Sequence, residues 1–156
     1  MTPTHAQRSH SPRPLDSIRV AEAMHRGVVT CRPDATLFTV ARLLAAHRIH
    51  GVVVVPATEN QVWSVVTDLD LASVVSDGLL GEATAESVAS APTVLVGPDD
   101  TLTRAAQLMH EFETHHLIVL GRGTHRPVGI ISTLDIADVL AEFSQLEMPN
   151  PGGGVR

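Results

Sequence analysis

Two short motifs pair a hydroxyl with a carboxylate at a spacing that suits a polar ligand. Thr67-Asp68-Leu69-Asp70 and Ser132-Thr133-Leu134-Asp135 each place the acid three residues after the hydroxyl, where a strand runs into an apolar helix. An ionised carboxylate accepts strong hydrogen bonds from neighbouring hydroxyl donors, and the start of a helix attracts phosphate. The same spacing is also a capping box, in which both side chains satisfy backbone N–H groups. The motifs predict a ligand site or a structural cap, and both roles can coexist.

The elements that position these motifs form an internal sequence repeat. Pro33–Leu37 recurs as Pro98–Leu102, and the matching residues downstream are separated by the same 65 positions. The spacing i, i+3, i+4, i+7 predicts one core-facing helix in each repeat, with the matching sets Leu37, Val40, Ala41, Leu44 and Leu102, Ala105, Ala106, Met109. Short apolar runs predict two buried strands after each helix: 52–55 and 62–66 in the first repeat, 117–120 and 128–131 in the second.

The duplication predicts the order short helix, strand, helix, strand, strand, helix in each repeat. The expected fold class is α/β (α+β), with two pseudosymmetric repeats that are each a small β-sheet flanked by helices. We expect a tail at 1–17, the first repeat at 18–77, a linker at 78–83, the second repeat at 84–145 and a tail at 146–156. A unit of about 60 residues buries too little surface alone, so the repeats should pack on each other.

The composition excludes several classes of function. A net charge of −6 and a pI near 5.8 argue against a nucleic-acid or lipid surface. Cys31 is the single cysteine, which indicates a reducing cytoplasm, and we expect it to be buried and inert. The first 17 residues lack the apolar run of a secretory signal, and no later segment is long enough for a membrane span. Without a nucleophile elbow, Walker loop or dinucleotide fingerprint, we expect no catalytic activity.

These repeated motifs resemble the CBS domain family, whose repeats occur in tandem as the Bateman module. The resemblance covers residues 18 to about 143 and rests on Val20-x-x-x-Met24, the Pro-Asp-x-Thr-Leu helix start, the strand after Gly51 and the closing S/T-x-x-D motifs. It implies a regulatory module that binds an adenosine-containing ligand, AMP, ADP, ATP or S-adenosylmethionine, between the repeats. The resemblance further implies that no cofactor is required and that ligand occupancy regulates a partner protein. The alternative is a structural homodimerisation module with vestigial sites.

The resemblance also assigns site residues. Thr67 or Ser132 would meet ribose or phosphate, and Asp70 or Asp135 would hold the ribose hydroxyls. The residues expected to enclose the base are Val29, Thr30, Gly51 and Val52 in the first repeat and Thr93, Val94, His116 and Leu117 in the second. Members of the family commonly form dimers, and the lightly charged helices after each motif favour a homodimer here.

The two sites are not expected to be equivalent. Asp68 would repel phosphate in the first repeat, and His116 stands where the first repeat has Gly51. We therefore favour the Ser132/Asp135 site for a phosphorylated ligand. Val53 and Ile118 replace a proline that relatives often carry, and Ser64 replaces the equivalent of Gly129. Arg122 and Arg126 would add positive charge if they fold inward and are otherwise solvated.

Nine histidines raise the question of a metal site, but their spacing matches no zinc motif and we expect none. His50 and His115 are repeat equivalents just before the central strands, so they could make ligand affinity depend on pH. Trp63 is expected to pack in the core rather than to stack on a base.

Overall fold

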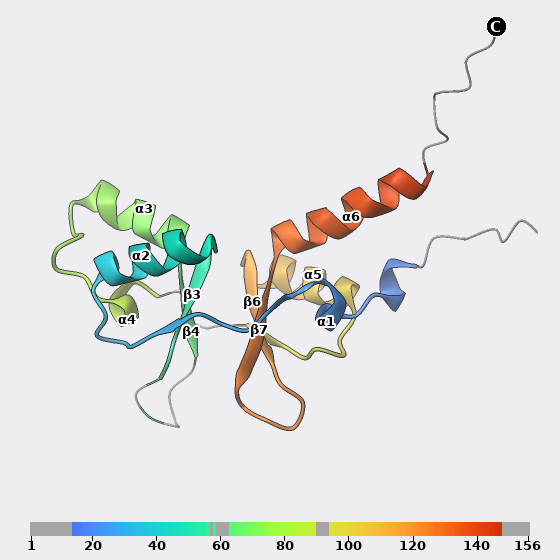
Figure 1. Ribbon diagram of the computed structural model, residues 1–156, viewed down its shortest axis with the longest axis horizontal. Coiled ribbons are helices and arrows are strands. Elements are labelled where there is room, and N and C mark those ends of the chain that lie inside the picture. The colour runs from blue at the N-terminus through green and yellow to red at the C-terminus, as the bar shows by residue number, and fades with distance from the viewer. Residues whose placement is uncertain (1–13, 57, 59–62, 90–93, 148–156) are drawn as a thin grey trace, which may run out of the picture.

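The computed structural model describes residues 14–56, 58, 63–89 and 94–147, and it folds into two small sheets that lie side by side with helices around them (Figure 1). The first repeat contains α1 (Val20–Ala23), β1 (His25–Arg26), β2 (Thr30–Cys31), α2 (Leu37–His47), β3 (Gly51–Val54), β4 (Ser64–Thr67) and α3 (Asp68–Asp77). The second contains α4 (Ala85–Val88), β5 (Leu95–Val96), α5 (Leu102–Glu111), β6 (His116–Leu120), β7 (Pro127–Ser132) and α6 (Thr133–Glu147). The short turn η1 (Leu15–Ser17) precedes them.

Threonine side chains start the long helix in the middle of each repeat. Thr36 accepts a hydrogen bond from the Thr39 N–H at 3.3 Å, and Thr101 accepts one from the Arg104 N–H at 3.1 Å. Both are N-caps that satisfy a backbone donor left free at the helix start. The repeated Pro-Asp-x-Thr-Leu sequence thus fixes where α2 and α5 begin.

The two sheets differ in one respect that matters for the site. The smaller sheet has the order β2-β3-β4, and the larger has the order β1-β7-β6-β5, so strand β1 of the first repeat joins the sheet of the second. In this pairing His25 lies opposite Ile130 and Arg26 lies opposite Gly129. The chain then crosses from β1 to β2 and so links one sheet to the other.

The short first helix of each repeat also packs on the other repeat. Val20 in α1 is fully buried in the core of the second repeat, and its N–H donates to the carbonyl of Asp100 at 2.9 Å. Ala85 in α4 is fully buried in the core of the first repeat, and its N–H donates to the carbonyl of Ala35 at 2.9 Å. This reciprocal exchange ties the two repeats into one structure.

Alternation along β3 and β6 builds the hydrophobic core on both faces of each sheet. Val52 and Leu117 face the helices of their own repeats, whereas Val53 and Ile118 meet Val65 between the two sheets. All of these side chains are buried, as the continuous apolar runs predict for strands covered on both faces. The repeats therefore pack on each other, as expected.

The predicted helices and strands are present in the predicted order, but the first repeat has one further strand, β1, and the bounds differ at a few ends. β4 begins at Ser64 rather than Val62, which lies outside the described residues. α6 continues to Glu147, past the expected start of the tail at 146. Within the described part of the chain, no helix is both long and apolar enough to cross a membrane.

Candidate functional site

Ser132 and Asp135 form a closed capping box where β7 passes into α6. The Ser132 backbone N–H donates to Asp135 Oδ2 at 2.6 Å, and the Ser132 hydroxyl donates to the same oxygen at 2.9 Å. The Asp135 N–H donates back to Ser132 Oγ at 3.4 Å. The cap predicted from the spacing is therefore present, and it uses one of the two carboxylate oxygens.

The second oxygen of Asp135 faces a histidine from the other repeat. Asp135 Oδ1 lies 2.8 Å from Nδ1 of His25, which is carried on β1. The Asp135 side chain is only 4% exposed, whereas the His25 side chain is 74% exposed. Asp135 is the one buried charged residue among the described residues, and its burial is compensated by these partners on both oxygens.

A cleft of about 480 Å³ opens beside Asp135, and we call it the inter-repeat cleft because both repeats supply its walls. Its size is in the range typical of small-molecule sites. The apolar lining residues are Val28, Val29, Ile49, Ile130 and Leu134, with Gly27 and Gly51. The polar lining residues are His25, Arg26, His47, Arg48, His50, His116, Ser132, Asp135 and Asp138.

The matching motif of the first repeat has the same cap but lies outside this cleft. The Thr67 N–H and hydroxyl donate to Asp70 Oδ2 at 2.7 and 2.8 Å, and the Asp70 N–H donates to Thr67 Oγ1 at 3.2 Å. Asp68 interacts with His50 Nδ1 through its Oδ2 at 2.7 Å, and this contact lowers the pKa of the Asp68 carboxyl. Asp68 thus stays ionised at the start of α3, where a phosphate would have to approach.

His116 is the most buried histidine of the cleft. Burial lowers the pKa of its imidazole, Asp68 and Asp135 act in the opposite direction, and His115 and His50 lower it further. The ring is therefore neutral at neutral pH and offers both a donor and an acceptor to a ligand.

The expected lining residues divide into two groups. Val29, Gly51 and His116 share the cleft with Ser132 and Asp135. Two of the other residues place their side chains elsewhere: Val52 and Leu117 turn them into the cores because neighbouring strand residues face opposite ways. Two more residues do not line it: Thr30 is exposed on β2, and Val94 packs on the core of the second repeat. Thr93 lies outside the described residues.

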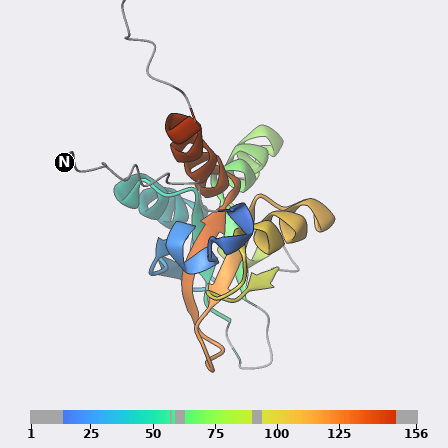
Figure 2. The same cartoon turned by 90° about the vertical axis from the view of Figure 1, so that its right-hand side faces the viewer.

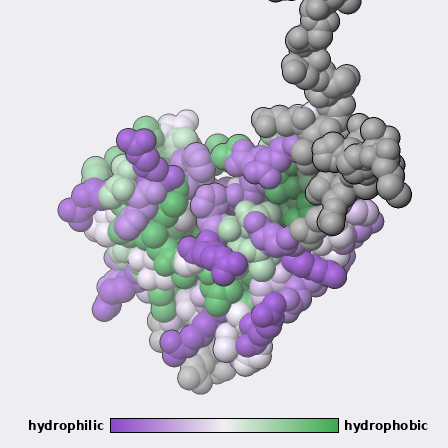
Figure 3. Space-filling view, turned by 45° about the vertical axis from the view of Figure 1, so that its right-hand side comes forward, coloured by the Kyte–Doolittle hydropathy of each residue, from purple (hydrophilic) through white to green (hydrophobic). Residues whose placement is uncertain are grey.

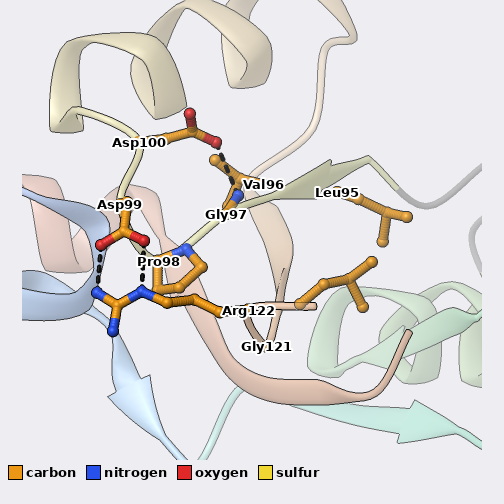
Figure 4. A pocket seen from close by; sticks show the side chains of 9 residues that line it. Leu95, Val96, Gly97, Pro98, Asp99, Asp100, Gly121 and Arg122 are labelled. Carbon is orange, nitrogen blue, oxygen red and sulfur yellow. Dashed lines mark hydrogen bonds and ion pairs between the residues drawn. The ribbon is translucent and has the colours of Figure 1, made fainter. Parts of the chain in front are cut away.

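Of the two alternatives for Arg122 and Arg126, the structure shows the solvated one, and neither side chain folds into the inter-repeat cleft. Arg122 forms an ion pair with Asp99, and the two line a separate cavity near β5 and the end of β6 (Figure 4). Arg126 is exposed and lines no part of the inter-repeat cleft. The positive charge of the cleft instead comes from Arg26 and Arg48.

Sequence reasoning missed Arg26, Arg48 and His25 because they enter the site through contacts between the repeats. Arg26 lies just after Val20-x-x-x-Met24, in the segment that crosses to the other sheet. Arg48 ends α2 in the left-handed conformation, with φ 52°, which turns the chain toward the cleft. The one available signal was their closeness in sequence to Val29 and Gly51.

The remaining candidate residues lie outside the inter-repeat cleft. Cys31 is buried, which raises the pKa of its thiol, and Trp63 packs against Val53, Val65 and Ile118 between the sheets. His115 lines a different cavity, between α5 and α6, so only His50 of the histidine pair reaches the cleft. Among the described residues, no group of three or more histidine, cysteine or acidic side chains is arranged to hold a metal ion.

The fold is a paired-repeat module. Its two small sheets pack face to face, its repeats exchange their first helices, and a cleft lies between them. The sequence profile of the CBS domain matches residues 20–77 and 85–142, so the chain belongs to the CBS domain family and carries a tandem pair. No curated protein matches the sequence significantly.

Solved structures of CBS proteins share this fold. A CBS domain protein from Pyrobaculum aerophilum complexed with AMP is 26% identical, over 82% of this chain and 99% of that one, with a TM-score of 0.68. The hexameric CBS-CP12 protein from bloom-forming cyanobacteria is 25% identical, over 85% of this chain and 76% of that one, with a TM-score of 0.71. The CBS domain pair of protein MJ0100, in complex with 5′-methylthioadenosine and S-adenosyl-L-methionine, is 18% identical, over 80% and 97%, with a TM-score of 0.70.

Proposed function

We propose that the chain is a regulatory module that binds an adenosine-containing ligand in the inter-repeat cleft, at the Ser132/Asp135 motif. The observation that carries this proposal is the almost fully buried Asp135 carboxylate at the wall of a cleft of about 480 Å³. A buried carboxylate in a partly apolar cleft is suited to accept hydrogen bonds from the two neighbouring hydroxyls of a ribose.

The other lining residues suit the remaining parts of a nucleotide. Val29, Ile49 and Ile130 provide apolar surface for the adenine ring. Arg26 and Arg48 provide guanidinium groups for a phosphate, with the geometry that favours bidentate contacts. These positive charges favour AMP, ADP or ATP over S-adenosylmethionine, and the AMP-bound relative at 26% identity supports the same ligand class.

The test compares ligands and two matched variants by thermal unfolding. AMP, ADP, ATP, S-adenosylmethionine and NADH are each added to the natural chain, to Asp135→Asn and to Asp70→Asn. Asparagine keeps the volume of the side chain and one capping oxygen. A ligand at a hundred times its Kd contributes about 2.7 kcal/mol, or about 10 °C in Tm for a domain of this size.

We expect this shift in the natural chain and in Asp70→Asn, and its loss in Asp135→Asn. Equal shifts in all three proteins would place the ligand elsewhere. No shift with any of the five compounds would favour the structural dimerisation module instead.

Exposed apolar side chains on α3 and α6 support homodimerisation as part of the same function. Leu69 and Val75 are 66% and 60% exposed, and their repeat equivalents Leu134 and Leu140 are 53% and 47% exposed. Both helices lie along the same upper side of the molecule (Figures 1 and 2), and exposed hydrophobic surface recurs between hydrophilic patches in Figure 3. We propose that a second copy covers this face and that ligand occupancy acts on a partner protein through the dimer.

A further inference from the structure

We infer that the His25 side chain acts as a latch on the ribose site. A ligand with two neighbouring hydroxyls must displace this side chain from Asp135 before both hydroxyls can bind the carboxylate. This inference rests on the proposed function, because it concerns how the Ser132/Asp135 cleft admits its ligand. It assigns a role to a side chain that belongs to neither repeated motif and that comes from the opposite repeat.

The hydrogen bonds of Asp135 leave too few free acceptor positions for both hydroxyls of a ribose. Oδ2 already accepts from the Ser132 N–H and hydroxyl at 2.6 and 2.9 Å, and these bonds start α6. Oδ1 is the oxygen that does not take part in the cap, and His25 Nδ1 lies 2.8 Å from it. Each carboxylate oxygen accepts about two hydrogen bonds, so one acceptor position remains, on Oδ1. Both hydroxyls of a ribose can therefore bind Asp135 only if His25 leaves Oδ1 or the cap breaks.

Replacing His25 costs less than breaking the cap. The His25 side chain is 74% exposed, so its ring can turn into solvent without opening a cavity. The cap, in contrast, is part-buried and includes a backbone N–H that would lose its partner. The exposed ring is thus the movable element of the site.

The backbone of His25 stays in place while its ring moves. His25 pairs with Ile130 across β1 and β7, and its carbonyl oxygen lies so close to Gly129 that a Cβ there would be 2.5 Å away. This close approach holds β1 against β7 on the floor of the cleft. Ligand entry therefore changes a side-chain contact between the repeats, at the strand that continues through Gly27–Val29 to the other sheet.

The experiment measures affinities by calorimetry for the natural chain, His25→Ala and His125→Ala. His125 is an exposed histidine that lines no part of the inter-repeat cleft, so it is the matched control. The two ligands are AMP and 2′,3′-dideoxy-AMP, which lacks both hydroxyls and needs no displacement. His25→Leu, which keeps bulk without a donor, replaces His25→Ala if the alanine variant does not fold.

We expect His25→Ala to bind AMP about two- to fivefold more tightly, which corresponds to about 0.4 to 1 kcal/mol for a hydrogen bond that no longer has to be broken. Its affinity for dideoxy-AMP and both affinities of His125→Ala should stay unchanged. If His25→Ala binds AMP and the natural chain does not, the latch is also supported, because the His25 contact then excludes the ligand entirely.

Two results would overturn the latch and can be told apart. If the natural chain binds AMP and His25→Ala binds it equally or more weakly, the latch is wrong and the proposed function stands. If neither protein binds AMP, both are wrong.

Discussion

Gly129→Ala tests whether the close contact of β1 with β7 supports the junction between the repeats. A Cβ at this position would lie 2.5 Å from the His25 carbonyl oxygen and 2.9 Å from the Met24 sulfur. The thioether can move, but the carbonyl belongs to the backbone of β1, so the strand itself must shift. Overpacking of this kind costs about 1–3 kcal/mol, and a shift also weakens backbone hydrogen bonds worth about 1 kcal/mol each. We expect the free energy of unfolding to fall by about 2–3 kcal/mol.

The assay is urea unfolding followed by the fluorescence of Trp63, the single tryptophan, which is half-buried between the two sheets. Gly81→Ala is the control, because a Cβ there meets no atom within 4 Å. Its free energy of unfolding should change by less than about 1 kcal/mol. A loss below about 0.5 kcal/mol in Gly129→Ala, with an unchanged dependence on urea, would show that β1 accommodates the added methyl group without a shift, contrary to this prediction.

Two further predictions concern pH and assembly. Burial lowers the pKa of the His116 imidazole in the folded chain. As the pH falls through about 6.5, the unfolded chain therefore takes up a proton at His116 before the folded chain does. The free energy of unfolding should fall between about pH 8 and about pH 5.5. His116→Gln should reduce this drop relative to the exposed His125→Gln in urea unfolding at both pH values, and equal drops would contradict the burial argument. Leu134→Glu places a charge on the exposed face of α6 and should turn a dimer into a monomer in light scattering, whereas Thr124→Glu in an exposed turn should not. A monomeric natural chain would contradict the dimer proposal.

The sequence predicted the parts of the fold that depend on local pattern. The 3.6-residue spacing from Leu37 and from Leu102 reflects helices that bury one face, and both helices begin at the threonines of the repeated motif. The capping boxes were equally predictable, since Ser132 and Asp135 interact within one turn. These features need only neighbours in sequence.

The exchange of α1 and α4 between repeats was not predictable in the same way. Val20 packs on Leu102 and Ile131, far along the chain, and nothing in its own spacing distinguishes one core from the other. The same holds for the site. His25 and Arg48 line the inter-repeat cleft with Asp135 only because β1 and the end of α2 come together there in the folded chain. Local pattern located the motif, and contacts between repeats decided its partners.

A methyl NMR titration with AMP tests directly whether an adenosine nucleotide binds in the inter-repeat cleft. The methyl signals of Val29 and Ile130, from the two walls of the cleft, should shift together and saturate. Signals of Met109 and Ile136 in the cavity between α5 and α6, and of Leu95 beside Asp99, should stay in place. Saturable shifts confined to either of those other cavities, or no shift at Val29 and Ile130, would contradict the claim.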